Sequence, residues 1–152
     1  MPAHPLPLEE NPNDPLVHAL PVQANANRLA RYGPVAARIA LGLIFTLAGA
    51  SIFFLIANPP PMPPGLAGSF TTVFFQSRWV VFVDLAELAT GVLLLANRFV
   101  PFALVMLAAI LSNILVFHAT MQPQTIFLPL FLTALWFVLA YQHRSNLTQL
   151  FK

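Results

Sequence analysis

Apolar residues fall into four long runs along the chain, separated by short segments rich in Pro, Asn, Gln and Arg. The runs cover about residues 35–57, 79–96, 99–117 and 126–141. A helix needs about 20 mostly apolar residues to cross hydrocarbon, so the first three suffice and the fourth needs its interfacial flanks. The pattern predicts an all-α membrane protein, a bundle of four transmembrane helices within residues 34–141.

The ends of the chain are more polar than this central part. Residues 1–33 contain six prolines and the acids Glu9, Glu10 and Asp14, and they bury too little apolar surface to offset the entropy of ordering. They predict a disordered, proline-rich tail. A cleaved signal peptide has its basic and apolar regions near Met1, whereas here the first long apolar run begins only at Pro34, which suits a first helical position. The first run is therefore expected to be a signal-anchor. Residues 142–152 form a second, short tail.

The connection between the first two runs has two parts. Residues 58–65 read Asn-Pro-Pro-Pro-Met-Pro-Pro-Gly, and proline removes backbone donors and restricts the preceding residue, so this segment ends any helix. Phe70 to Gln76 is aromatic-rich and too short to span, which predicts a segment at the membrane interface before Trp79 opens the second run.

Basic residues give the orientation, because cytoplasmic flanks are enriched in them. Only Arg78 lies on one side of the predicted bundle; the other six basic residues share the opposite side, namely Arg28, Arg31, Arg38, Arg98, Arg144 and Lys152. Both termini are therefore expected in the cytoplasm. Arg38 is expected to extend to the inner headgroups.

Composition excludes several function classes. With 58% apolar and 8% charged residues the chain cannot solvate a soluble surface, and its main partner is the bilayer. Seven scattered basic residues give no nucleic-acid face. Zero cysteines exclude thiolate chemistry, and His118 has no second ligand at metal spacing, so neither a metal nor a covalent cofactor is expected.

Polar residues inside the runs are the functional candidates. Asp84 and Glu87 lie three positions apart on one face of the second run, where an acid costs a few kcal/mol or more unless protonated, paired or hydrated. At about 1.5 Å per residue, Asp84 and Asn113 lie roughly 8 Å below the outer surface, and Glu87 about 12 Å. His118 lies at the boundary and Ser112 precedes Asn113, while the first run brings Ser51 to about 9 Å and Thr46 deeper. The sequence predicts a polar pocket in the outer half, opening toward Arg78, His118 and residues 70–75.

Each candidate also has a simpler interpretation. Buried acids and a lone amide such as Asn113 often hold helices together by hydrogen bonds. His118 could be a solvated helix end, and Arg78 an interfacial anchor.

Two stretches of the sequence resemble the DoxX-like family of four-helix membrane proteins. They are Glu87-Leu-Ala-Thr-Gly-Val-Leu-Leu-Leu-Ala-Asn-Arg-Phe-Val-Pro101 and Ser112-Asn-Ile-Leu-Val-Phe-His118, and residues 38–49 resemble that family's first span. The resemblance covers about residues 38–141. Thr90 departs from the pattern, since a second glycine is common there.

The resemblance implies a bacterial inner-membrane protein, and some members are similar to small subunits of quinone-linked oxidoreductases. The residues are compatible with a quinone site, where Glu87 would relay protons, Asp84 would modulate its charge, and Asn113 and His118 would bind the ligand, with Ser112 and Arg78 nearby. Such a subunit is not an autonomous enzyme, because its electrons would come from an oxidoreductase partner. A proton-coupled transporter or channel component, and an anchor that recruits partners through residues 1–33, are the alternatives. The ligand and any homo-oligomer stay open.

Overall fold

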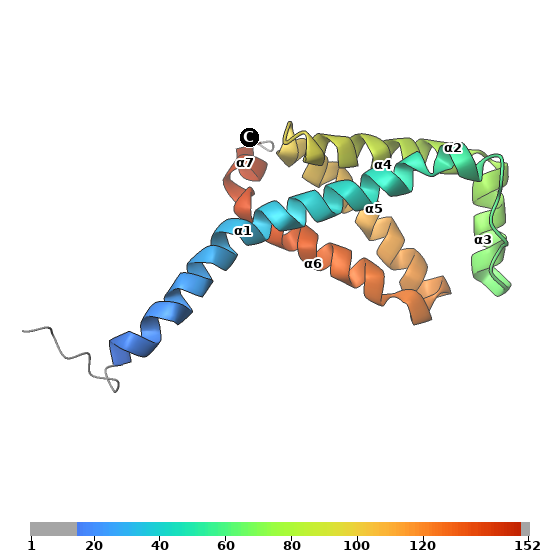
Figure 1. Cartoon of the computed structure of the whole chain (residues 1–152). Coiled ribbons are helices and arrows are strands. Elements are labelled where there is room, and N and C mark those ends of the chain that lie inside the picture. Colours follow the sequence, from blue (N-terminus) through green and yellow to red (C-terminus); the bar gives the residue numbers. More distant parts are fainter. Residues whose placement is uncertain (1–14, 150–152) are drawn as a thin grey trace, which may run out of the picture. The chain divides into compact units, whose positions relative to one another are not determined.

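The computed structural model describes residues 15–149, and within them every regular element is a helix. The chain divides into two compact units, Met1–Gly33 and Pro34–Lys152, and the buried core residues all belong to the second. The elements of the described part are labelled in Figure 1: α1 (Pro15–Ala50), α2 (Ile52–Leu55), α3 (Gly65–Gln76), α4 (Trp79–Leu95), α5 (Val100–Met121), the 3-10 turn η1 (Pro123–Thr125), α6 (Phe127–Gln142) and α7 (Arg144–Gln149).

Helix α1 is longer than the sequence analysis predicted. It begins at Pro15, so residues 15–33 of the expected disordered tail are helical and Pro34 lies inside the helix rather than at its start. Between Pro21 and Pro34 the chain has no proline and is rich in Ala, Leu, Gln and Arg, which are good helix formers. The prediction gave the prolines too much weight, although the second unit does begin at Pro34, where a backbone donor is missing. Residues 1–14 lie outside the described part.

Within residues 15–149, two helical stretches are long and apolar enough to cross a membrane. They are Arg31–Leu55, with 25 residues and a mean hydropathy of 2.0, and Val100–Met121, with 22 residues and a mean hydropathy of 2.4. Helix α6 is apolar but has only 16 residues, and α4 has 17. The two stretches fall on the first and third predicted runs.

Glycines allow α1 to lie directly against α4. A Cβ atom on Gly49 would meet the backbone of Asp84 and Leu88, and one on Gly91 would meet the backbone nitrogen and the hydroxyl of Thr46. At Gly42 it would lie 2.8 Å from the Leu95 side chain and 3.2 Å from the Gly91 carbonyl oxygen. Because rising numbers on α1 meet falling numbers on α4, the two helices are antiparallel. Close approach of this kind increases dispersion contact between helices.

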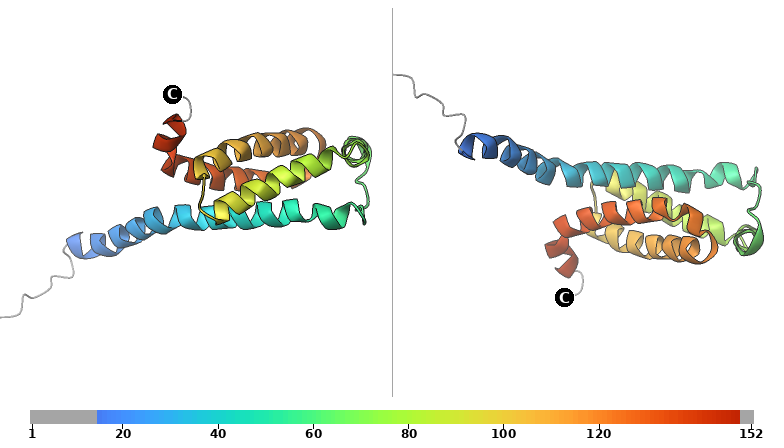
Figure 2. Two further views of the ribbon diagram at one scale, coloured as in Figure 1. Left: turned by 90° about the horizontal axis from the view of Figure 1, so that it is seen from above. Right: turned by 90° about the horizontal axis from the view of Figure 1, so that it is seen from below.

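The core lies among α1, α4, α5 and α6 (Figure 2). Leu41 of α1, Leu94 of α4, Leu104 and Leu107 of α5, and Leu139 of α6 are all fully buried. A hydrogen bond of 2.9 Å from the Trp136 indole nitrogen to the Leu104 carbonyl oxygen joins α6 to α5.

Arg38 has a different role from the expected one. Its guanidinium donates to the carbonyl oxygen of Leu94 and, at 3.4 Å, to that of Leu95, both at the last turn of α4. The Leu94 carbonyl oxygen also accepts from the backbone N–H groups of Ala96 and, at 3.2 Å, of Asn97, and a cation at a helix C-terminus interacts favourably with the helix dipole. Arg38 therefore caps α4 from the neighbouring helix instead of extending away from the bundle.

Left-handed residues shape the two corners of α4. Asn97 (φ 54°) and Phe99 (φ 51°) reverse the chain within the short turn between α4 and α5. At the other end Arg78 (φ 60°) makes a sharp corner between α3 and α4. As a result α3 lies across one end of the bundle in both Figure 1 and Figure 2.

Candidate functional site

A pocket of about 910 Å³ lies between α3, the first half of α4 and the second half of α5. This volume is in the range of small-molecule sites. Most lining side chains are aromatic or aliphatic, and the polar ones are few: Thr71, Ser77, Asp84, Glu87, Asn113, His118 and Thr120.

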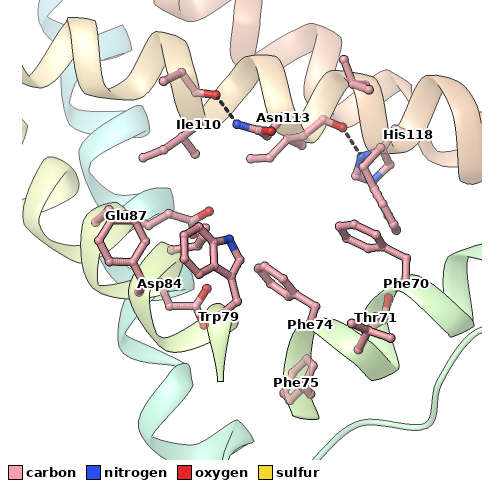
Figure 3. A pocket seen from close by; sticks show the side chains of 18 of the residues that line it. Phe70, Thr71, Phe74, Phe75, Trp79, Asp84, Glu87, Ile110, Asn113 and His118 are labelled. Carbon is pink, nitrogen blue, oxygen red and sulfur yellow. Dashed lines mark hydrogen bonds between the residues drawn. The ribbon is translucent and has the colours of Figure 1, made fainter. Parts of the chain in front are cut away.

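The acids of α4 are the only charged residues among those lining the pocket, if His118 is neutral. Glu87 is 9% exposed and Asp84 is half-buried. Three residues separate them, so one helical face carries both. Figure 3 shows both side chains projecting from α4 into the pocket, and among the residues drawn there neither carboxyl group takes part in a hydrogen bond.

Asn113 and His118 face these acids from α5 (Figure 3). The Asn113 amide donates one N–H to the Ala109 carbonyl oxygen at 3.0 Å, which leaves its second N–H and its oxygen for a ligand. The Nδ1 of His118 lies 2.8 Å from the Ile114 carbonyl oxygen. A carbonyl only accepts, so Nδ1 carries a proton and Nε2 of the neutral ring is an acceptor.

The hydroxyl groups on the pocket wall add no free donors. Thr71, Ser77 and Thr120 donate to the carbonyl oxygens of Ala67, Phe74 and Val116 within their own helices, at 2.8, 3.2 and 2.7 Å. Their oxygen atoms can still accept, although that of Ser77 already accepts from the Trp79 backbone N–H at 3.4 Å. Together with the two carboxyl groups and His118 Nε2, they give the wall more acceptors than donors, and its donors include the second N–H of Asn113 and the indole N–H of Trp79.

Helix α3 supplies the aromatic wall. Phe70 stacks on Phe74 with ring centroids 5.8 Å apart and contacts Phe117 of α5 at 5.4 Å. Gly65 begins the helix with φ +72°, and Gly68 packs directly on the Pro63 carbonyl group, where a side chain would collide. The proline segment thus holds α3 in place over the pocket.

Four of the six predicted site residues come together here. Asp84, Glu87, Asn113 and His118 line one pocket, while Arg78 and Ser112 are exposed and are absent from its wall. The Ser112 hydroxyl donates to the Ala108 carbonyl oxygen of its own helix. From α1, Thr46 and Ser51 do not line it either: Thr46 is turned toward Gly91, and Ser51 donates to Ala48 at 2.6 Å. The expected polar contribution of α1 is therefore wrong, because depth alone ignores the direction of each side chain.

Sequence reasoning missed part of the wall. It expected the pocket to open toward residues 70–75 but did not predict that they form a helix, and it did not include Trp79 and Phe82 of α4 among the lining residues. The spacing of four residues between Phe70 and Phe74 was the available signal.

Among the residues that the structure describes, no group of three His, Cys, Asp or Glu side chains could hold a metal ion. The chain matches no family model, no curated protein and no solved structure.

Proposed function

We propose that this chain is a DoxX-like, four-helix protein of a bacterial inner membrane, a redox-associated subunit whose pocket binds a quinone or a similar small molecule. The observation that carries the proposal is the pocket, in which an aromatic slot ends at Asp84 and Glu87 on one helix and Asn113 and His118 on another.

The outward faces of the helices support a place in the bilayer. Large apolar side chains outside the pocket are exposed along every long helix of the bundle, among them Leu47 (69%), Val92 (47%), Phe102 (55%), Phe127 (78%) and Phe137 (62%). In water such extended apolar surfaces promote association, whereas lipid solvates them. At about 25 Å, α4 falls slightly short of a hydrocarbon layer of about 30 Å, and Trp79 and Arg98 are suited to sit at the two interfaces.

The absence of cysteine makes the topology directly testable. With both termini in the cytoplasm, single cysteines at Asn58 and Gln122 in intact cells react with a membrane-impermeant maleimide, while those at Asn97 and Ser145 react only after the membrane is opened. Equal labelling of all four positions in intact cells contradicts the four-span arrangement.

The polar groups suit both redox states of a quinone. The second N–H of Asn113 and a protonated Glu87 can donate to quinone carbonyls, while Glu87 carboxylate and His118 Nε2 can accept from quinol hydroxyls. Reduction of a quinone takes two electrons and two protons. Glu87 would relay protons, with Asp84 modulating its charge, and the electrons would come from an oxidoreductase partner.

The packed core weighs against a transporter. Beyond the pocket, toward the turn between α4 and α5, the buried residues Leu94, Leu104 and Leu107 are aliphatic. A water path would have to cross these side chains, whereas a binding pocket needs only the end that is lined by polar groups.

The experiment is purification of the tagged protein from its own membranes in mild detergent, followed by mass spectrometry of copurifying proteins and extracted quinones. We expect a stoichiometric oxidoreductase partner and enriched quinone. Glu87→Gln should lose the quinone, and the matched control Ser112→Ala should keep it, because Ser112 does not line the pocket. A protein that comes out alone and free of quinone contradicts the proposal.

A further inference from the structure

The described side chains that line the pocket include two carboxylic acids but no lysine or arginine. Glu87 is nine-tenths buried, points into the pocket and forms no hydrogen bond with the residues drawn in Figure 3. A buried carboxylate without a partner is costly, so a positive charge placed here would be strongly favoured.

The arginines of the bundle are placed elsewhere. Arg38 is bound to the last turn of α4, and Arg144 lies over the Tyr141 ring at 4.5 Å. Arg98 is exposed in the turn at the far end of α4, and Arg78 is exposed outside the pocket wall. Within residues 34–149 of the described part, no basic side chain other than His118 lines the pocket, so a bound ligand could supply the cation that pairs with Asp84 and Glu87.

The rest of the wall also suits a cation. Phe70, Phe74 and Phe117 form one group of rings, and Trp79 and Phe82 form a second, with centroids 5.2 Å apart. The face of an aromatic ring attracts positive charge, and quaternary ammonium groups are commonly bound by several such rings. The apolar substituents of such a ligand would fill the remaining volume.

We propose that this pocket binds lipophilic organic cations, in which a quaternary or protonated centre carries bulky apolar groups. The positive centre lies near Glu87 and Asp84, and the substituents contact the rings of α3 and α4. This site shares its residues with the proposed quinone site but requires neither a quinone nor a redox partner.

The test compares two probes of nearly equal size and shape and opposite charge, tetraphenylphosphonium and tetraphenylborate, by equilibrium dialysis against the full chain in an uncharged detergent. We expect saturable binding of the phosphonium only. Glu87→Gln should weaken it by about thirtyfold or more, as expected for removing one partner of a buried charge pair. Phe70→Ala should weaken it about three- to tenfold through the lost ring. Ser112→Ala should leave it unchanged.

A second measurement avoids variants that fail to fold. Dicyclohexylcarbodiimide modifies carboxyl groups in apolar surroundings, and mass spectrometry of peptides locates the modified residue. Tetraphenylphosphonium should protect Glu87 of the unaltered protein, and tetraphenylborate should not.

Equal binding of both probes, or unaltered phosphonium binding by folded Glu87→Gln, overturns the inference. Adding a short-chain benzoquinone to the same dialysis separates it from the proposed function. Quinone binding without phosphonium binding leaves only the quinone site, and phosphonium binding without quinone binding leaves only the cation site.

Discussion

The contact between α1 and α4 gives the sharpest test of the fold, through Gly49→Ala. Alanine is the better helix former by about 1 kcal/mol, so the substitution stabilises an isolated helix. Here its Cβ meets the Asp84 carbonyl oxygen and the Leu88 backbone nitrogen, which no rotamer change can move. Overpacking costs typically about 1–3 kcal/mol, and a severe contact with fixed backbone atoms belongs at the upper end of that range. After the gain of about 1 kcal/mol in helix propensity, we expect the free energy of unfolding to fall by about 2 kcal/mol.

Gly42→Ala is the matched control, on the same helix and with the same substitution. Its Cβ meets mainly the Leu95 side chain, 2.8 Å away, and Leu95 is 36% exposed and can turn outward. The gain in helix propensity then offsets most of the crowding, and we expect a change within about 0.5 kcal/mol.

The assay is unfolding in mixed micelles with increasing dodecyl sulfate, followed by far-ultraviolet circular dichroism and tryptophan fluorescence. The predicted order of stability is unaltered protein and Gly42→Ala together, with Gly49→Ala below both. A Gly49→Ala protein as stable as Gly42→Ala would show that α1 does not lie against α4 at this point, and the assignment of the α4 backbone as a fixed support would fail.

Two further substitutions test the tertiary hydrogen bonds in the same assay. Arg38→Leu should lower the free energy of unfolding by about 1–2 kcal/mol because the last carbonyls of α4, including that of Leu94, lose a charged donor, and Arg38→Lys should restore part of it. If the Arg38→Leu protein is as stable as the unaltered one, the Arg38 guanidinium does not bind the last carbonyls of α4. Trp136→Phe should lower the free energy of unfolding by about 1 kcal/mol, because the hydrogen bond to the Leu104 carbonyl oxygen is lost. Trp79→Phe, at an exposed position, should cost less than half as much. Equal losses from the two substitutions would contradict the hydrogen bond between Trp136 and Leu104.

The helical class could be predicted because long apolar runs leave few alternatives, and the acids stood out because their burial is costly. Asp84 and Glu87 share a face, as their spacing predicts. The depth of a residue along its helix, however, did not predict the direction in which its side chain points around the helix axis. Ser112 and Asn113 differ by one residue and therefore by about 100°, and only Asn113 lines the pocket.

Other features depend on contacts between distant residues, which a pattern along one chain does not contain. Arg38 caps α4 because the last turn of that helix ends beside it, and its partner Leu94 lies 56 positions later in the sequence. The position of α3 follows from the left-handed residue Arg78 and the close contact of Gly68 with Pro63. The corner at Arg78 has no recognisable signal in the sequence, since arginine seldom adopts a positive φ.

The two walls of the pocket are held in different ways, and this division has a consequence for recognition. Behind the turn of α4 that carries Asp84 and Glu87, Gly49 brings the backbone of α1 into direct contact, so the charged wall is fixed by a whole helix. The aromatic wall belongs to the 12-residue helix α3, which crosses the end of the bundle and joins α4 through a two-residue corner. Charge selection should therefore be strict, because α1 backs the helix that carries both acids. The contact of Gly68 with Pro63 holds the aromatic wall at the pocket, so ligands of one charge that fit these rings are what such an arrangement accommodates.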